Sequence, residues 1–263
     1  MPTAPRFDHA VVVTGLRMDD AVALFGRLGF LVTERGHHTL GSINHLLVLG
    51  QTYIELLGLP PDRPDARPEL RDSVPGLDAL VFGSDDADAT WAETTSRAAP
   101  IGPVQAFSRP VRTAQGERDA AFRTVRCLPG SAQAGRLYFC EHLTPELVWQ
   151  DAWRAHPNGA VELVEAHLQV SDLDREAHLY RQLLGDQAVR IEREGFSAQA
   201  LPVRIFATRA EGVARMSGLT LRVRDLSHTA AYLEKAGFNV LRSPGRIEIE
   251  AAQAWNIALG FVA

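Results

Sequence analysis

Short apolar runs, each bounded by glycines or polar turns, recur along the chain and are interrupted by single amphipathic segments. The first run, FDHAVVVTG at 7–15, is rich in β-branched residues and predicts a strand. Apolar residues then recur at helical spacing in RMDDAVALFGRLGF, where Gly29 favours a helix end. Three further strand-like runs follow, FLVTERGHHTL, SINHLLVLG and QTYIELLG. The pattern therefore predicts a strand, a helix and three strands (βαβββ) over residues 7–58.

This order returns three more times, from residues 76, 161 and 216. The last strands are alike, since QTYIELLG (51–58) and QAWNIALG (253–260) both begin with Gln and end with Leu-Gly. A repeat of this kind is stronger evidence for the fold than any single motif. It predicts an α+β fold of four tandem modules, 7–58, 76–149, 161–208 and 214–263. We expect them to pair into domains 1–156 and 160–263, because Pro157, Asn158 and Gly159 favour a turn between them.

Composition and charge exclude several classes of protein. The net charge of −5 argues against nucleic acid as a partner. No run of about 18 apolar residues is present, so we expect no membrane span. No signal peptide is visible, and the 2 cysteines are too few for a disulfide framework, which together favour the cytoplasm. Neither GxGxxG nor GxxxxGK occurs, so we expect no nucleotide cofactor.

Several stretches resemble the vicinal oxygen chelate superfamily, which contains glyoxalase I, extradiol dioxygenases and bleomycin-resistance proteins. They are FDHAVVV, GSINHLLVLGQTYIELLG and the linker LTPELVWQDAWRAHPNGA, and they are closest to the glyoxalase-like branch. The resemblance covers nearly all of 7–160 and, more weakly, 161–263. It implies two glyoxalase-like domains, each a pair of modules curled into a cup by a mixed sheet.

The resemblance also implies a divalent metal ion in the cup, held by the first and last strands of each module. In the first module, His9 and Glu55 match the two ligand positions, and side-chain alternation places Tyr53 on the same face as Glu55. In the second module, Glu141 matches Glu55, and Asp78 occupies the position expected for a histidine. One imidazole with carboxylates suits Fe, Mn, Ni, Co or Zn. Glu55 and Glu141 are the candidate catalytic groups, because a glutamate released from the metal can carry a proton.

Other residues are candidates for contact with a substrate. Phe139 corresponds to Tyr53 in the second module, and Trp149 follows the last strand, where it could pack over a ligand. His38 lies near the mouth of the first cup. Arg109 and Arg123 belong to one predicted hairpin, and if either reaches the cup the substrate is acidic, because guanidinium groups bind carboxylates bidentately. The alternative is an exposed, charge-balanced hairpin.

The second domain lacks the same ligand set. Its first strand offers Glu165 and His167, but Ile257 stands at the position of Glu55. We therefore interpret this domain as a structural partner or lid for the first.

Two functions remain open. The first is a metal-dependent lyase, isomerase or dioxygenase acting on a small oxygenated molecule in the N-terminal cup, and it is favoured by His9, Glu55 and Glu141. The second is a metal-free binding protein of the bleomycin-resistance type, and the lack of a clear fourth ligand favours it. Because the four modules of one chain can complete both cups, we expect catalysis to need no second chain. The sequence leaves open whether the protein forms a homodimer.

Overall fold

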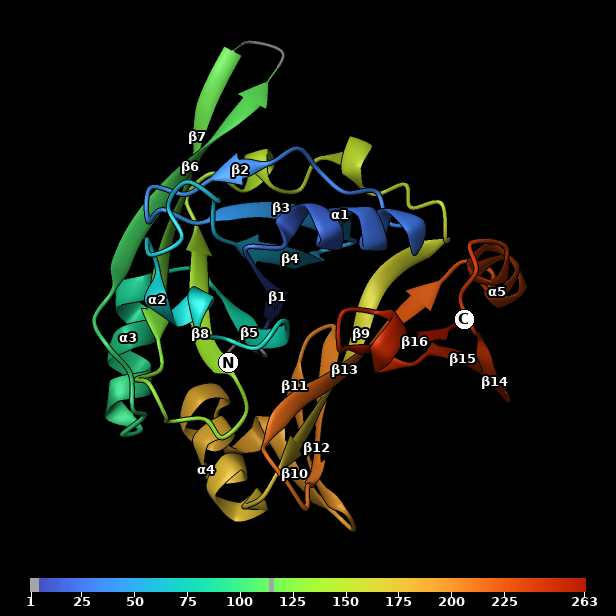
Figure 1. The fold of residues 1–263 in the computed structure, drawn as a ribbon. Coiled ribbons are helices and arrows are strands. Elements are labelled where there is room, and N and C mark those ends of the chain that lie inside the picture. The colour runs from blue at the N-terminus through green and yellow to red at the C-terminus, as the bar shows by residue number, and fades with distance from the viewer. Residues whose placement is uncertain (1–4, 114–115) are drawn as a thin grey trace.

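The computed structural model describes residues 5–113 and 116–263, and these residues form two eight-stranded mixed sheets with helices on their outer faces (Figure 1). Residues 1–4, where the first predicted domain begins, lie outside the described residues. The strand orders are β2-β3-β4-β1-β5-β8-β7-β6 and β10-β11-β12-β9-β13-β16-β15-β14. Each sheet is built from two βαβββ modules, so the predicted α+β fold of paired modules is confirmed.

The first sheet and its helices comprise β1 (Phe7–Gly15), α1 (Met18–Arg27), β2 (Gly36–His37), β3 (Ile43–Leu49), β4 (Thr52–Gly58), β5 (Gly76–Ser84), α3 (Ala87–Ser96), β6 (Gln105–Thr113), β7 (Gly116–Arg126) and β8 (Arg136–His142). The short helix α2 (Pro68–Arg71) lies in the connection between its two modules.

The second sheet and its helices comprise β9 (Ala160–Val170), α4 (Leu173–Leu184), β10 (Val189–Glu192), β11 (Gly195–Ala200), β12 (Val203–Arg209), β13 (Arg215–Val223), α5 (Leu226–Lys235), β14 (Leu241–Ser243), β15 (Arg246–Ile249) and β16 (Ala258–Val262).

The first strands of paired modules lie next to each other at the centre of each sheet. Strand β1 runs parallel to β4, with His9 opposite Tyr53, and antiparallel to β5. Strand β9 repeats this arrangement with β12 and β13. The central strands therefore carry side chains from both modules to the same inner face.

One predicted strand is much shorter in the structure. The run FLVTERGHHTL contributes only β2; before it, the Thr33 N–H donates to the Leu46 oxygen at 3.0 Å, and the other contacts with β3 involve side chains. The backbone oxygen of Thr33 is bound by Nδ1 of His45, and Thr33 Oγ1 accepts from the Leu46 N–H. These contacts hold residues near 33 beside β3 without regular pairing.

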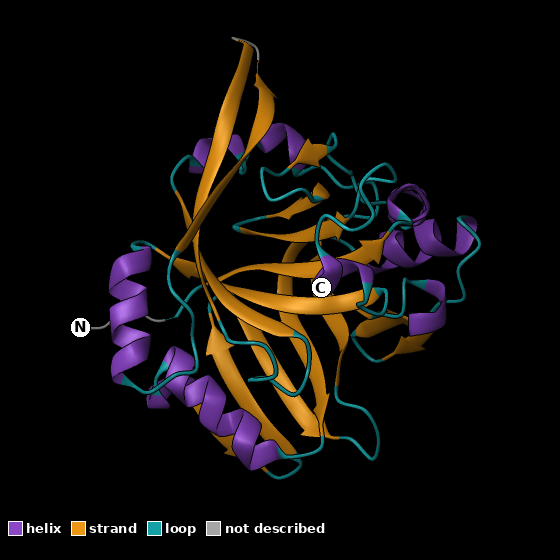
Figure 2. Cartoon of the chain, turned by 60° about the vertical axis from the view of Figure 1, so that its left-hand side comes forward, coloured by secondary structure: helices purple, strands orange, loops and turns teal. Residues whose placement is uncertain are grey.

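The first sheet curls until its edges meet. The Thr39 N–H, just after β2, donates to the Ser108 oxygen of β6 at 2.9 Å, and the Ser108 N–H donates to Thr39 Oγ1 at 3.1 Å. Figure 2 shows the long β6–β7 hairpin rising beyond the rest of the fold. The inner face is thus an enclosed cup.

Apolar side chains cover both faces of the first sheet. On β1, Ala10 and Val12 point to the outer core, which continues into the second domain, whereas Val11 and Val13 belong to the apolar cluster on the inner face. The Trp255 indole N–H donates to the Val13 oxygen at 3.0 Å, so the second domain also holds β1 through its backbone. Among the described residues, no helix is long and apolar enough to cross a bilayer.

Candidate active site in the first cup

The first sheet encloses a cavity of about 860 Å³. Apolar side chains such as Leu46, Leu57, Phe107 and Phe122 form much of its wall. This volume lies within the range of pockets that take small organic ligands. Polar and charged side chains also line it, and they decide its chemistry.

Glu55, on β4, lies between two imidazoles that come from different parts of the module. Its Oε2 is 3.8 Å from Nε2 of His9 on β1, and its Oε1 is 3.8 Å from Nε2 of His38, which follows β2. The Asn44 amide on β3 donates to Oε1 at 2.7 Å and fixes the carboxylate. Three strands and a turn therefore bring two imidazoles and one carboxylate together.

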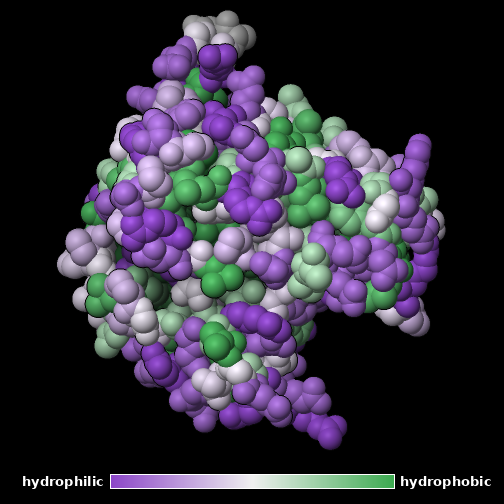
Figure 3. All heavy atoms as spheres, in the orientation of Figure 1, coloured by the Kyte–Doolittle hydropathy of each residue, from purple (hydrophilic) through white to green (hydrophobic). Residues whose placement is uncertain are grey.

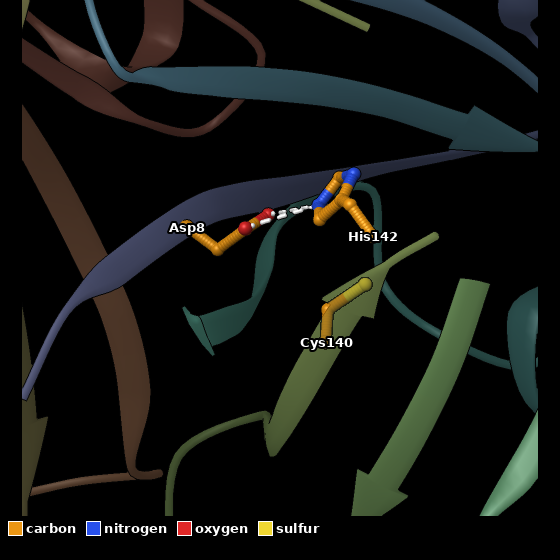
Figure 4. A group of neighbouring side chains, drawn as sticks. All are labelled: Asp8, Cys140 and His142. Atoms are coloured by element: carbon orange, nitrogen blue, oxygen red, sulfur yellow. Dashed lines mark hydrogen bonds and ion pairs between the residues drawn. The ribbon is translucent and has the colours of Figure 1, made fainter. Parts of the chain in front are cut away.

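The buried Asp8 carboxylate supports His9 from behind, with Asp8 Oδ1 2.6 Å from His9 Nδ1. His142 Nε2 lies 3.0 Å from the same carboxylate (Figure 4). Burial alone raises the pKa of Asp8, but the imidazoles of His142 and His9 more than offset this and hold it well below its usual range. Ionised Asp8 binds a proton on Nδ1 of His9, so the lone pair of Nε2 faces the cavity.

His38 is neutral at pH 7. Burial lowers the pKa of its imidazole to about 4, Glu55 opposes this shift, and Arg109 and Arg67 add to it. Its Nδ1 is 2.9 Å from Ser42 Oγ. A neutral imidazole with one nitrogen held in a hydrogen bond is the form that binds metal ions.

These residues fit a divalent transition metal. Two imidazoles and one carboxylate with room for further ligands form a familiar donor set for iron and related ions. Nitrogen and oxygen ligands that bind one ion at about 2.1 Å lie roughly 3.0–3.4 Å apart. The two contacts of Glu55 are longer, at 3.8 Å each and through different carboxylate oxygens, so the three side chains would have to move closer together to share one ion.

A second group of donors is more compact but less suitable. The atoms of Asp8, Cys140 and His142 lie within 4.8 Å of one another (Figure 4). However, Asp8 already binds His9 and His142, and burial raises the pKa of the Cys140 thiol well above its usual range. An ion bound there would therefore have to displace a proton from the thiol and compete with two imidazoles for Asp8. We therefore place the better donor set around Glu55.

The structure does not bring Glu141 into the cup. Its side chain lies on the outer side of β8, where Oε2 accepts from the N–H of Ala87 at the start of α3. Arg123 lies beside it, 3.3 Å from Glu141 Oε2 and 2.6 Å from Asp88. Both residues thus form an ion-pair network outside the cavity.

Asp78 and Phe139 also lie away from Glu55. Asp78 accepts from Arg136 Nε at 2.6 Å, and Phe139 packs in the outer core. The register explains the difference: Val11 pairs with Glu55 in the first module, and Val81 pairs with Tyr138 in the second. Tyr138 therefore takes the cup-facing place that the sequence assigned to Glu141, and its hydroxyl lies 3.5 Å from His9 Nε2.

Of the remaining predicted substrate residues, two line the cavity and one lies outside it. Tyr53 stacks on the His9 ring with centroids 4.3 Å apart, and Arg109 lines the cavity. Trp149 lies behind Tyr53, against His142, and does not line the cavity.

Sequence reasoning missed several residues that complete the site. They are Asp8, Asn44, Arg67, Arg126, Arg136 and Tyr138. Asp8 stands beside His9, and both Asp8 and Asn44 are polar residues within apolar strands, which was a usable signal. Arg67 lies in the connection between modules, whose position no local pattern gives.

The second domain presents an open concave face instead of a closed cup. Glu165 lies 3.4 Å from both His167 Nε2 and Arg246 Nη1, so the polar groups on this face pair with one another. Figure 3 shows the molecule hollowed at the lower right, between the two arms of the second sheet. Ile257 is fully buried just before β16.

Comparisons with known proteins agree with this architecture. The family model described as a glyoxalase-like domain matches residues 7–184. No curated protein is significantly similar. A hypothetical protein from Staphylococcus aureus superposes with a TM-score of 0.72 at 9% identity, covering 98% of this chain and 99% of its own.

Two further similar structures carry names of enzymes. A xylose isomerase-like TIM barrel/4-hydroxyphenylpyruvate dioxygenase fusion protein gives a TM-score of 0.66 at 15% identity, over 99% of this chain and 50% of its own. A mutant 4-hydroxymandelate synthase from Streptomyces coelicolor gives 0.63 at 14% identity, over 100% and 93%. At these identities the likeness shows the fold alone.

Proposed function

We propose that this chain, which belongs to the glyoxalase-like domain family, is an enzyme that uses a divalent metal ion in its N-terminal cup. Its substrate is a small oxygenated molecule, and its reaction is that of a lyase, isomerase or dioxygenase. The observation that carries the proposal is the Glu55 carboxylate, 3.8 Å from the Nε2 atoms of both His9 and His38, inside a cavity of about 860 Å³.

His9, His38 and Glu55 would hold the ion, chosen from Fe, Mn, Ni, Co and Zn. A bound ion would polarise an oxygen of the substrate as a Lewis acid. The other residues act through these three. Asp8 keeps the proton of His9 on Nδ1, and the Asn44 amide orients Glu55, which can accept or return a proton in a site largely shielded from water.

The fold relatives support a metal-using reaction. One is named as a dioxygenase fusion and another as a synthase, and both share the fold of the whole chain. These names describe those two proteins. For the present chain they favour an enzyme over a metal-free binding protein.

A metal-free binding protein is the second candidate. Two positions that the family resemblance assigns to ligands, Glu141 and Asp78, are engaged with Arg123 and Arg136 away from Glu55. A large, mainly apolar cavity is also what a protein that sequesters a small molecule needs.

Metal analysis of protein purified without chelator distinguishes the two. We expect near-stoichiometric metal in the wild type and in Glu141→Gln, and loss of metal in Glu55→Gln with an unchanged fold. If the wild type binds none of the five metals after reconstitution, the binding protein is correct.

We further propose that each chain works alone in the cytoplasm, with domains 1–156 and 160–263. Strands of one chain enclose the first cup, since its edges meet at Thr39 and Ser108. Activity per chain should therefore be independent of protein concentration. A linear loss of specific activity on dilution would show that a dimer is needed.

A further inference from the structure

Arg109 is a buried cation without an anionic partner. It lies on β6, faces the cavity and is 6% exposed. Within residues 5–113 and 116–263, no side chain or backbone oxygen pairs with its guanidinium. A charged group held largely out of water without a partner is unfavourable, and an anion in the cavity could supply that partner.

The other arginines of the cup are all engaged. Arg67 donates to Glu69 at 2.8 Å, and Arg136 donates to Asp78 at 2.6 Å. Arg126 donates to Thr124 Oγ1 at 3.2 Å and lies over the Tyr138 ring. Arg109 thus differs from these three arginines, because its guanidinium is the one without a partner among the described residues of the cup.

The surrounding structure makes room for this guanidinium. A Cβ on Gly36 would lie 3.0 Å from Cδ and 3.2 Å from Nη1 of Arg109, so the arginine packs closely against this glycine. The neighbouring Ser108 is tied to Thr39 by two hydrogen bonds, which fix this part of β6 across the opening of the sheet. Burial lowers the pKa of Arg109, and Tyr53 and Glu55 oppose this shift.

We propose that the substrate of this cup is a carboxylic acid whose carboxylate binds to the Arg109 guanidinium. This rests on the proposed function in so far as it uses the same cavity. The planar guanidinium presents paired N–H donors that match the two oxygens of a carboxylate. The apolar body of the acid packs against Phe107 and Phe122, whose rings stack with centroids 5.1 Å apart.

Binding is measured by calorimetry on the full chain, both stripped of metal and reloaded. The probes are 3-phenylpropanoate and its neutral analogue 3-phenylpropanamide. We expect the acid to bind at least tenfold more tightly than the amide, and Arg109→Met to abolish this preference. Arg118→Met is the control, because Arg118 is an exposed arginine on β7 that pairs with Glu146 outside the cavity.

Thermal unfolding of the ligand-free variants gives an independent readout. Arg109→Met should raise Tm by a few degrees, because it removes a buried unpaired charge. Arg136→Met should lower Tm, because it leaves Asp78 without its partner. The opposite order would overturn the inference.

The binding outcomes separate this inference from the proposed function. Equal affinity for acid and amide, or no binding of either, overturns the carboxylate assignment. Acid binding that needs metal and survives Arg109→Met also overturns it, while leaving the metal enzyme intact. Acid binding that depends on Arg109 in a protein that takes up no metal confirms the inference and rejects the metal.

Discussion

Asp8 and His9 are adjacent in β1, yet Asp8 Oδ1 and His9 Nδ1 lie 2.6 Å apart in one hydrogen bond. Adjacent side chains of a regular strand point to opposite faces. The pairing of β1 with β5 shifts register between Phe7 and His9, and this irregularity lets both side chains join one network. A local distortion of the central strand thus supplies His9 with its supporting carboxylate.

Asp8→Asn should weaken metal binding about 10- to 100-fold, because carboxylates behind metal-bound histidines have effects of this size. The side chain keeps its volume, so the fold should remain. Metal titration followed by calorimetry measures the change, and Asp88→Asn on the outer surface is the control. Equal metal affinity in the two variants would show that Asp8 has no supporting role.

Gly36→Ala should impair the site, because the new Cβ would lie 2.3 Å from Asn44 Oδ1. Asn44 must move, and its 2.7 Å hydrogen bond to Glu55 is then lost. We expect about a tenfold loss of metal affinity. Gly26→Ala, in α1 with nothing within 4 Å of the new Cβ, should instead stabilise the protein by up to about 1 kcal/mol. Comparable effects of the two substitutions would contradict this account.

Glu165 should contribute a pH-dependent stability to the second domain. Its hydrogen bond to His167 lowers the pKa to about 2, against the partial burial that raises it. The unfolded chain takes up the proton near pH 4.5, so the contribution is complete above that pH and disappears as the pH falls towards 2. Its size is below about 1 kcal/mol, because the pair is partly exposed. The Tm difference between wild type and Glu165→Gln should shrink from pH 6 to about pH 3; a constant difference would exclude this linkage.

Ile257→Glu should destabilise the protein by several kcal/mol without creating a metal site, because Ile257 is fully buried and a charge there has no partner. Ile257→Val, which only removes a methylene, should cost about 1 kcal/mol. Urea denaturation compares the two. Metal uptake by the second domain of Ile257→Glu would show that its cup needs only a carboxylate.

Part of the candidate site could be predicted from the sequence because its signals are local. The alternation in FDHAVVV and TYIELLG places His9 and Glu55 within two strands that the repeat brings together, and they lie 3.8 Å apart in the structure. The repeat itself determines four modules, since each run of strand, helix and three strands carries its own periodicity and turns.

The side of β8 that faces the cup could not be predicted in this way. In RLYFCEH each alternating set mixes apolar and polar residues, because Cys140 shares a face with Tyr138 and His142, and Phe139 shares the other with Glu141. A strand with polar residues on both faces does not reveal which face points inward, and a shift of one residue exchanges the faces. Only the pairing of β5 with β8 decided that Tyr138 enters the cup and Glu141 leaves it.

The tertiary structure also decided the roles of His38 and Arg109. His38 follows a two-residue strand, and Arg109 lies on the hairpin that closes the sheet. Neither position follows from spacing, because both depend on how far the sheet curls before its edges meet. The sequence by itself therefore determined the modules and the pair His9–Glu55, whereas long-range closure of the first sheet determined which imidazole and which guanidinium join them.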